Sequence, residues 1–171
     1  MTAVLDESVQ RYTSEPGSGR IRPTVTGTAA GGSTRLSGGK FNWEADLPPM
    51  IGGGNLAPSP TAYLLGALAG CAVAFVKDTL APQFGVRIDD VRAEASCSSD
   101  LGGLLGVEGT NPRLTDLAIE ITIDSPDDQD RIEEVKQAWL QRCPVYLALV
   151  EPQEVAVRFT STDVEGSDDE R

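Results

Sequence analysis

Three cysteines, Cys71, Cys97 and Cys143, are the residues of this sequence whose side chains could carry redox chemistry. A thiolate is a good nucleophile, and two thiols that meet can be oxidised to a disulfide and reduced again. The chain has no histidine, which excludes Ser-His-Asp and Cys-His catalysis and histidine-ligated zinc or haem. The cysteines lack the paired spacing of a zinc site. Any catalysis must therefore use thiols, carboxylates, hydroxyls or amines, and we expect no metal and no cofactor.

Cys71 lies in a stretch that is uncharged from Ala62 to Val76. Ser59 is a natural helix cap and is followed by a proline, so a helix is expected from residue 60 until just before Pro82. This helix is apolar on nearly every side and rich in glycine and alanine, which indicates that it is buried and closely packed. Its uncharged run is shorter than the roughly 20 residues of a membrane span. An apolar site in the middle of a helix disfavours a thiolate unless a cation reaches it.

Cys143 directly precedes Pro144, at the end of an amphipathic helix expected to begin at Ser125 and Pro126. If Cys143 is the first residue of the next short element, the helix dipole favours its thiolate; if it ends the preceding helix, the dipole opposes it. The sequence leaves both possibilities open. Cys97 lies on the inward face of an expected strand, where a cysteine most often packs as a small hydrophobic residue.

The remaining segments predict an α+β fold with antiparallel strands. Alternating apolar and polar residues indicate strands, and a loop rich in proline and glycine separates the early strands from the helix that carries Cys71. The expected strands lie within residues 22–29, 38–46, 86–99, 113–124 and 154–161, and the segment "LPPMIGGGNLAPSP" that gives the loop covers residues 47–60.

The chain is expected to form one domain, residues 21–161, between a mobile tail at 1–20 and an acidic mobile tail at 162–171. Its formal charge of −12 comes from 26 acidic and 14 basic residues. This charge argues against nucleic acid and anionic membranes as partners. No stretch has the pattern of a secretory signal, so a cytoplasmic location is expected.

Three motifs in this order, "SPTAYLLGALAGC", "GLLG" and "RCPV", resemble the OsmC/Ohr family of thiol-dependent hydroperoxide reductases. The resemblance extends from about Gly38 to Phe159. It implies an intertwined homodimer in which antiparallel sheets wrap around long apolar helices, which would cover the apolar helix. It also implies an antioxidant role in stress response: Cys71 attacks the O–O bond of an organic hydroperoxide, Cys143 resolves the sulfenic acid as a disulfide, and a dithiol restores both thiols.

The sequence departs from the family at two positions that would support the thiolate. Active members have a glutamate directly after the proline that starts the helix, where this chain has Thr61, and an arginine in an earlier turn, where this chain has "TAAGG". Arg35 is the best substitute for the missing cation. Other candidates are Arg20 or Arg22 as the cation, and Glu44 or Asp46 as the group that orients it.

Two functions are compatible with these residues. In the first, the chain reduces fatty or aryl hydroperoxides in an apolar channel under the loop that carries Met50 and Ile51, with Thr61 at its edge. In the second, an OsmC-like dimer without peroxidase turnover binds a small apolar ligand or exchanges electrons with other thiols. The third reading, a structural dimer with three buried thiols, would make the paired motifs a coincidence.

Overall fold

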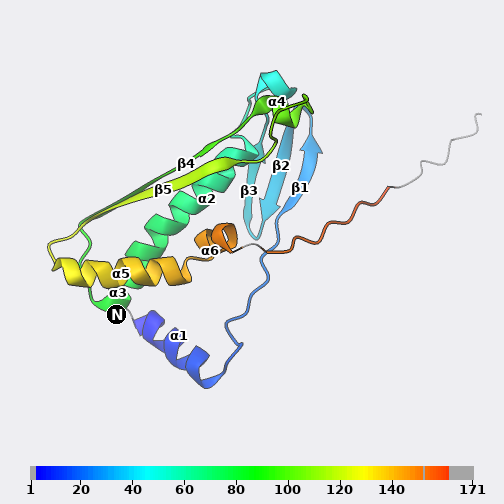
Figure 1. Ribbon diagram of the computed structural model, residues 1–171. Coiled ribbons are helices and arrows are strands. Elements are labelled where there is room, and N and C mark those ends of the chain that lie inside the picture. Colours follow the sequence, from blue (N-terminus) through cyan, green and yellow to red (C-terminus); the bar gives the residue numbers. More distant parts are fainter. Residues whose placement is uncertain (1–2, 152, 162–171) are drawn as a thin grey trace, which may run out of the picture.

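The computed structural model describes residues 3–151 and 153–161, and it shows an α+β fold with two antiparallel sheets, as expected (Figure 1). One sheet has three strands and the other has two, and a long helix runs beneath the two-stranded sheet. The acidic tail expected at 162–171 lies outside the described residues.

The three-stranded sheet consists of β1 (Thr26–Ala30), β2 (Ser33–Gly38) and β3 (Phe41–Ala45), each antiparallel to the next. Gly31 and Gly39 occupy the two turns with positive φ angles of 62° and 57°, a conformation that a side chain would disfavour. The sequence predicted the outer strands, and the structure adds β2 between them.

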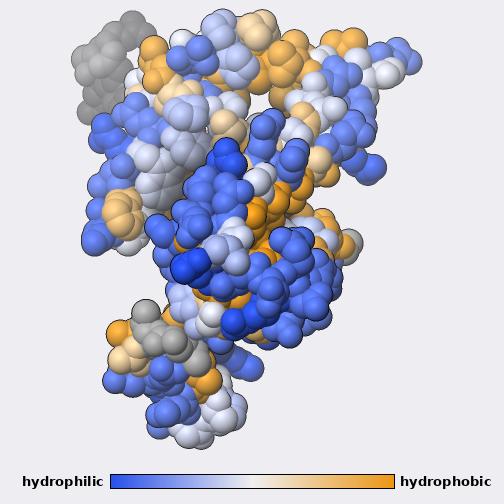
Figure 2. Space-filling model, turned by 90° about the vertical axis from the view of Figure 1, so that its left-hand side faces the viewer, coloured by the Kyte–Doolittle hydropathy of each residue, from blue (hydrophilic) through white to orange (hydrophobic). Residues whose placement is uncertain are grey.

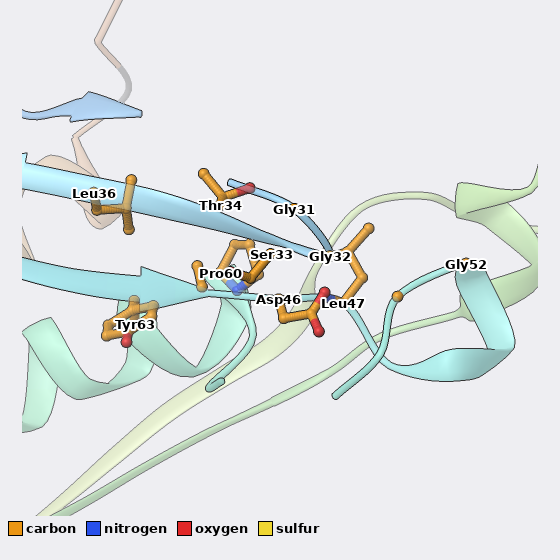
Figure 3. Close-up of a pocket in the computed structure, with 12 residues that line it drawn as sticks. Gly31, Gly32, Ser33, Thr34, Leu36, Asp46, Leu47, Gly52, Pro60 and Tyr63 are labelled. Carbon is orange, nitrogen blue, oxygen red and sulfur yellow. The ribbon is translucent and has the colours of Figure 1, made fainter. Parts of the chain in front are cut away.

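The loop after β3 is organised by the buried carboxylate of Asp46, which is 8% exposed (Figure 3). This carboxylate accepts three backbone N–H groups, which hold its pKa below the ordinary value despite the opposing effect of burial. The donors belong to Leu56, Leu47 and Gly54. Gly53 lets the loop close, because a Cβ there would lie 1.9 Å from the carbonyl oxygen of Leu47. The loop also contains a short 3₁₀ turn, η1 (Pro49–Ile51).

The central helix α2 (Pro60–Phe75) begins as predicted, with the side chain of Ser59 accepting the N–H of Ala62. One face of α2 packs against the two-stranded sheet, and Leu68 and Ala72 are buried there.

The predicted end of this helix before Pro82 is wrong. A π-helical turn, η2 (Val76–Leu80), continues α2 without a break into α3 (Ala81–Phe84). The N–H of Ala81 donates to the carbonyl of Val76, five residues earlier. This wider turn changes the spacing of the carbonyls just before Pro82, where a regular α-helix would clash with the proline ring. The helix therefore continues through Pro82 instead of ending before it.

The two-stranded sheet pairs β4 (Asp90–Ser98) with β5 (Thr115–Asp124), which confirms the two long strands. Cys97 is half-buried on the inward-facing row of β4, at a register shift between Ser96 and Ser98. A short helix, α4 (Leu101–Leu104), lies in the connection.

After β5 the chain forms α5 (Gln129–Arg142) and α6 (Pro144–Val150). The predicted start of α5 at Ser125 is wrong, because Asp128 is the cap. Ser125 instead accepts the N–H of Asp127 and donates to the carbonyl of Arg87. The predicted apolar stripe of α5 is confirmed, and its buried residues are Ile132, Val135, Ala138 and Trp139.

Both ends of the described chain differ from expectation. Part of the expected N-terminal tail forms a helix, α1 (Ala3–Ser14), none of whose residues is buried. The strand expected at 154–161 is absent: residues 153–161 have no ladder partner in the described chain. The alternating apolar side chains that predicted this strand stand in solvent, with Val155, Val157 and Phe159 exposed by 78%, 70% and 94%.

Candidate active site

The fold brings Cys71 and Cys143 into contact. Their Sγ atoms lie 3.4 Å apart, with the thiol of Cys143 donating to the sulfur of Cys71, although the residues are 72 positions apart in sequence. A disulfide has an S–S length of about 2.05 Å, so the sulfurs need to approach by only about 1.4 Å. Cys71 lies within α2, and Cys143 lies at the junction of α5 and α6.

Cys143 both ends α5 and caps α6. Its N–H donates to the carbonyl of Trp139, and its own carbonyl accepts the N–H of Leu147. The two possibilities left open by the sequence therefore both hold, and the dipoles of the two helix ends act on this residue in opposite directions. Cys143 is 0% exposed and belongs to the main hydrophobic core.

Cys71 is partly exposed in the middle of α2, and its pKa is raised to about 11. Burial is the main cause, followed by the hydrogen bond and the charge interaction with Cys143. The backbone N–H of Val145 acts in the opposite direction and lowers the pKa. No cation among residues 3–151 and 153–161 contributes to this pKa. At neutral pH the thiolate is therefore the minor form of Cys71 in this single chain.

Arg35, the predicted substitute cation, lies in the three-stranded sheet. It is exposed on β2, directly across from Glu44 on β3. Glu44 also holds the start of α2, because its carbonyl accepts the hydroxyl of Tyr63. Within one chain the structure shows no contact between Arg35 and Cys71.

The residues predicted to bind substrate gather at the start of α2. Thr61 precedes Cys71 by ten residues, which corresponds to about 15 Å along a helix. Ile51 and Thr61 line one cavity of about 400 Å³, which Leu101 and Leu104 of α4 also line, while Met50 is 67% exposed. A neighbouring hollow of about 420 Å³ is bordered by Pro60, Tyr63 and the loop around Asp46 (Figure 3). Within one chain, none of these residues is positioned at Cys71.

A different apolar cavity, which sequence reasoning missed, is lined by residues that neighbour Cys143 in the chain. Its volume is about 360 Å³. It is lined by Trp139, whose carbonyl accepts the N–H of Cys143, and by Tyr146. The rings of Trp139 and Tyr146 pack at a tilt of 40°, with their centroids 5.0 Å apart. The other lining residues are Val76, Ile119, Ile121, Ile123, Lys136 and Leu140. The sequence predicted the apolar faces of β5 and α5, but it did not predict that these faces lie next to α6, because that arrangement depends on the tertiary fold.

One face of α2 beside Cys71 is uncovered. Gly66, Ala67, Gly70 and Ala74 are exposed there, and a Cβ added to either glycine would meet nothing within 4 Å. We call this set the small-residue face. Figure 2 shows, from another side, that apolar surface remains exposed between hydrophilic regions of this chain.

The continuous helix Pro60–Phe84 is 25 residues long and, by length and composition alone, is apolar enough to cross a membrane. Lys77 and Asp78 lie within it. Its opposite face packs against β4 and belongs to the core, as in the central helix of a folded domain.

Comparison with known proteins identifies the fold. An OsmC-like protein from Mycoplasma pneumoniae is similar, with a TM-score of 0.62 and 22% identity, covering 77% of this chain and 89% of that chain. A putative osmotic stress induced and detoxification response protein from Psychrobacter arcticus 273-4 has a TM-score of 0.58 and 21% identity, covering 75% of this chain and 89% of that chain. An organic hydroperoxide resistance protein OsmC from Legionella pneumophila has a TM-score of 0.55 and 16% identity, with the same two coverages of 75% and 89%. At these identities the likeness concerns the fold.

A comparison with the curated proteins finds no match. The model of the family described as OsmC-like protein matches residues 52–158. This range includes both members of the cysteine pair and the helices that carry them. Because the match covers more than half of the sequence, the chain belongs to the OsmC-like family.

Proposed function

We propose that this protein is a thiol redox protein of stress defence that reduces organic hydroperoxides through Cys71 and Cys143. The observation that carries the proposal is the 3.4 Å separation of the two sulfurs, one partly exposed and the other fully buried. The organic hydroperoxide resistance protein named among the similar structures supports the same chemistry. Three free thiols are also compatible with a reducing compartment such as the cytoplasm.

In the proposed reaction the thiolate of Cys71 attacks the terminal oxygen of the hydroperoxide. The O–O bond breaks, the alkoxide takes up a proton and leaves as an alcohol, and Cys71 becomes a sulfenic acid. The sulfur of Cys143 then attacks the sulfur of Cys71, and water leaves as the disulfide forms. Two electrons have passed from the protein to the peroxide, and a dithiol reductant returns them.

An organic rather than an inorganic peroxide fits the surroundings of the pair. The core around Cys143 and the nearby cavity of about 360 Å³ are lined mainly by apolar side chains. Such a lining favours a hydroperoxide with a fatty or aryl group over hydrogen peroxide. Fatty and aryl hydroperoxides are therefore the proposed substrates.

We also propose that the working form is a homodimer. The small-residue face allows a second backbone to approach closely, and the exposed alternating segment at 155–159 could pair with a sheet edge of another copy. In such a dimer, residues from β2, η1 and the start of α2 of one chain could approach Cys71 of the other. These are the residues to which the sequence assigned supporting roles: Arg35, Met50, Ile51 and Thr61.

The proposed function is tested by adding an equimolar aryl hydroperoxide, cumene hydroperoxide, to the fully reduced protein and measuring free thiols and intact mass. We expect the loss of two thiols and a decrease of about two hydrogen masses, because the net product is one disulfide. Peptide mapping should find the disulfide between Cys71 and Cys143.

A Cys97→Ser variant is the matched control, since Cys97 lies outside the pair, and it should lose the same two thiols. Survival of both thiols of the pair after prolonged incubation would refute the proposed peroxide reaction.

A second candidate function is supported by the raised pKa of Cys71. A thiol with a pKa of about 11 and no cation beside it in the described chain is a slow nucleophile at neutral pH. The protein would then be a dithiol redox partner, or an apolar-ligand binder, without peroxidase turnover. In that case a general thiol oxidant such as diamide would produce the disulfide, whereas cumene hydroperoxide would not.

The dimer is tested by Gly70→Leu, which adds bulk to the small-residue face. The isolated chain has open space there, and leucine favours a helix more than glycine does, so the chain should fold. We expect light scattering to change from the mass of two chains for the unaltered protein to that of one for the variant. A leucine at an exposed position of α5, Glu134→Leu, is the matched control and should leave the dimer intact. If the unaltered protein already has the mass of one chain, the proposed dimer is contradicted.

A further inference from the structure

We propose that the reductant attacks the oxidised pair at Cys71 alone, so that every bond to an outside molecule is made by Cys71, and Cys143 bonds only to Cys71. This inference rests on the cysteine pair of the proposed function. It adds which sulfur the reducing thiol must reach.

The first step is the difference in access between the two sulfurs. Cys143 is 0% exposed, enclosed by the same core that contains Ala72, Val135 and Trp139. Cys71, by contrast, is partly exposed. Association with a second copy can only add cover, so it cannot open Cys143.

The second step is the geometry of thiol exchange. An incoming thiolate, the sulfur that it attacks and the sulfur that leaves must lie nearly in line, so attack requires free space behind the attacked sulfur. Behind Cys143 lies the packed core. The side chain of Cys71 keeps part of its own surface exposed. Only the approach to Cys71 is therefore open.

The exchange then proceeds in two balanced displacements. The first thiolate of the dithiol bonds to Cys71, the protein S–S bond breaks, and Cys143 leaves as a thiolate that takes up a proton. The second thiol of the reductant then loses its proton and attacks the reductant's first sulfur, which is bonded to Cys71 in the mixed disulfide. Cys71 leaves as a thiolate and is then protonated. The reductant is oxidised by two electrons to a disulfide, and both protein thiols are restored.

The test starts from a disulfide made without peroxide, so that it does not depend on peroxidase activity. Protein with Cys97→Ser is oxidised by diamide, treated briefly with 2-mercaptoethanol, quenched in acid, denatured and alkylated. Peptide mass mapping then measures the mercaptoethanol adduct on each cysteine. We expect at least about ten times more adduct on Cys71 than on Cys143 at the earliest times, because a buried sulfur exchanges slowly.

Single-thiol variants provide a second measurement. Cys97→Ser is combined either with Cys143→Ser, which leaves Cys71, or with Cys71→Ser, which leaves Cys143. Each reduced variant is treated with an aromatic disulfide at the same high pH, once in the folded state and once in denaturant. The Cys71 thiol should react at least about tenfold faster in the folded protein, and the two rates should converge in denaturant.

The outcomes separate this inference from the proposed function. Equal or greater adduct on Cys143 overturns the inference alone. Failure of diamide to form the disulfide overturns both, because the pair itself would be wrong. A disulfide that diamide forms but cumene hydroperoxide does not, with the adduct on Cys71, refutes the peroxidase reaction and upholds the inference.

Discussion

Replacing Cys71 with serine is expected to abolish hydroperoxide consumption, with a loss of at least about a hundredfold in rate, because a serine hydroxyl is not an appreciable nucleophile at neutral pH and has no accessible sulfenic state. The assay follows the loss of cumene hydroperoxide in the presence of excess dithiothreitol. Serine is nearly isosteric with cysteine, so the fold and the packing around Ala72 should persist.

Two other cysteine variants complete this experiment. Cys97→Ser should retain full activity, because Cys97 lies in β4 outside the pair. Cys143→Ser should consume one equivalent of peroxide in the absence of reductant and leave a sulfenic acid on Cys71, which excess peroxide oxidises to the sulfinic acid. If Cys71→Ser kept the rate of the unaltered protein, Cys71 would not be the reacting thiol.

The second large effect is the pH dependence of Cys71 reactivity. Burial and the neighbouring Cys143 raise the pKa of Cys71 to about 11, so the thiolate is the minor form at every pH below that value. Its fraction should increase about tenfold for each pH unit, or about a thousandfold between pH 7 and pH 10. We expect this slope in the rate of alkylation by iodoacetamide, measured in Cys97→Ser by mapping the label on Cys71.

A rate that levels off below pH 8 would contradict this expectation. It would mean that a cation stabilises the thiolate in the assembled protein, and the second copy would have to supply it. Arg35→Gln would then identify the source: the plateau should move to higher pH if Arg35 is that cation. Arg92→Gln, on the outer face of β4, is the matched control, because Arg92 pairs with Asp90 and Asp124.

The elements predicted correctly are those whose signals are local. Ser59 followed by a proline fixed the start of α2, and the alternating residues of β4 and β5 gave both strands. The errors arose where distant groups decide. Pro82 normally ends a helix, but here the π-helical turn before it lets the helix continue. The apolar alternation near Val157 meets the local requirements of a strand, yet a strand also needs an edge to pair with.

The site shows the same division. The chemical types of Cys71 and Cys143 were visible in the sequence, and their partnership was implied by resemblance to a family, but their contact depends on how α6 packs against α2. The raised pKa of Cys71 could be anticipated from its apolar helix. The contribution of the Val145 amide could not, because it depends on the orientation of a backbone group from a separate helix.

The 72-position separation of the paired cysteines has a thermodynamic consequence. A disulfide that closes so long a loop restricts the unfolded chain and, in the loop-entropy model, stabilises the folded state by about 4 kcal/mol. The coupling is reciprocal, because a fold that holds the two sulfurs together stabilises the disulfide relative to the dithiol by the same free energy. The equilibrium between disulfide and dithiol is then coupled to the equilibrium between the folded and unfolded chain. A cell that oxidises this protein would also make it harder to denature, and its melting temperature would increase with the fraction of the protein that holds the disulfide.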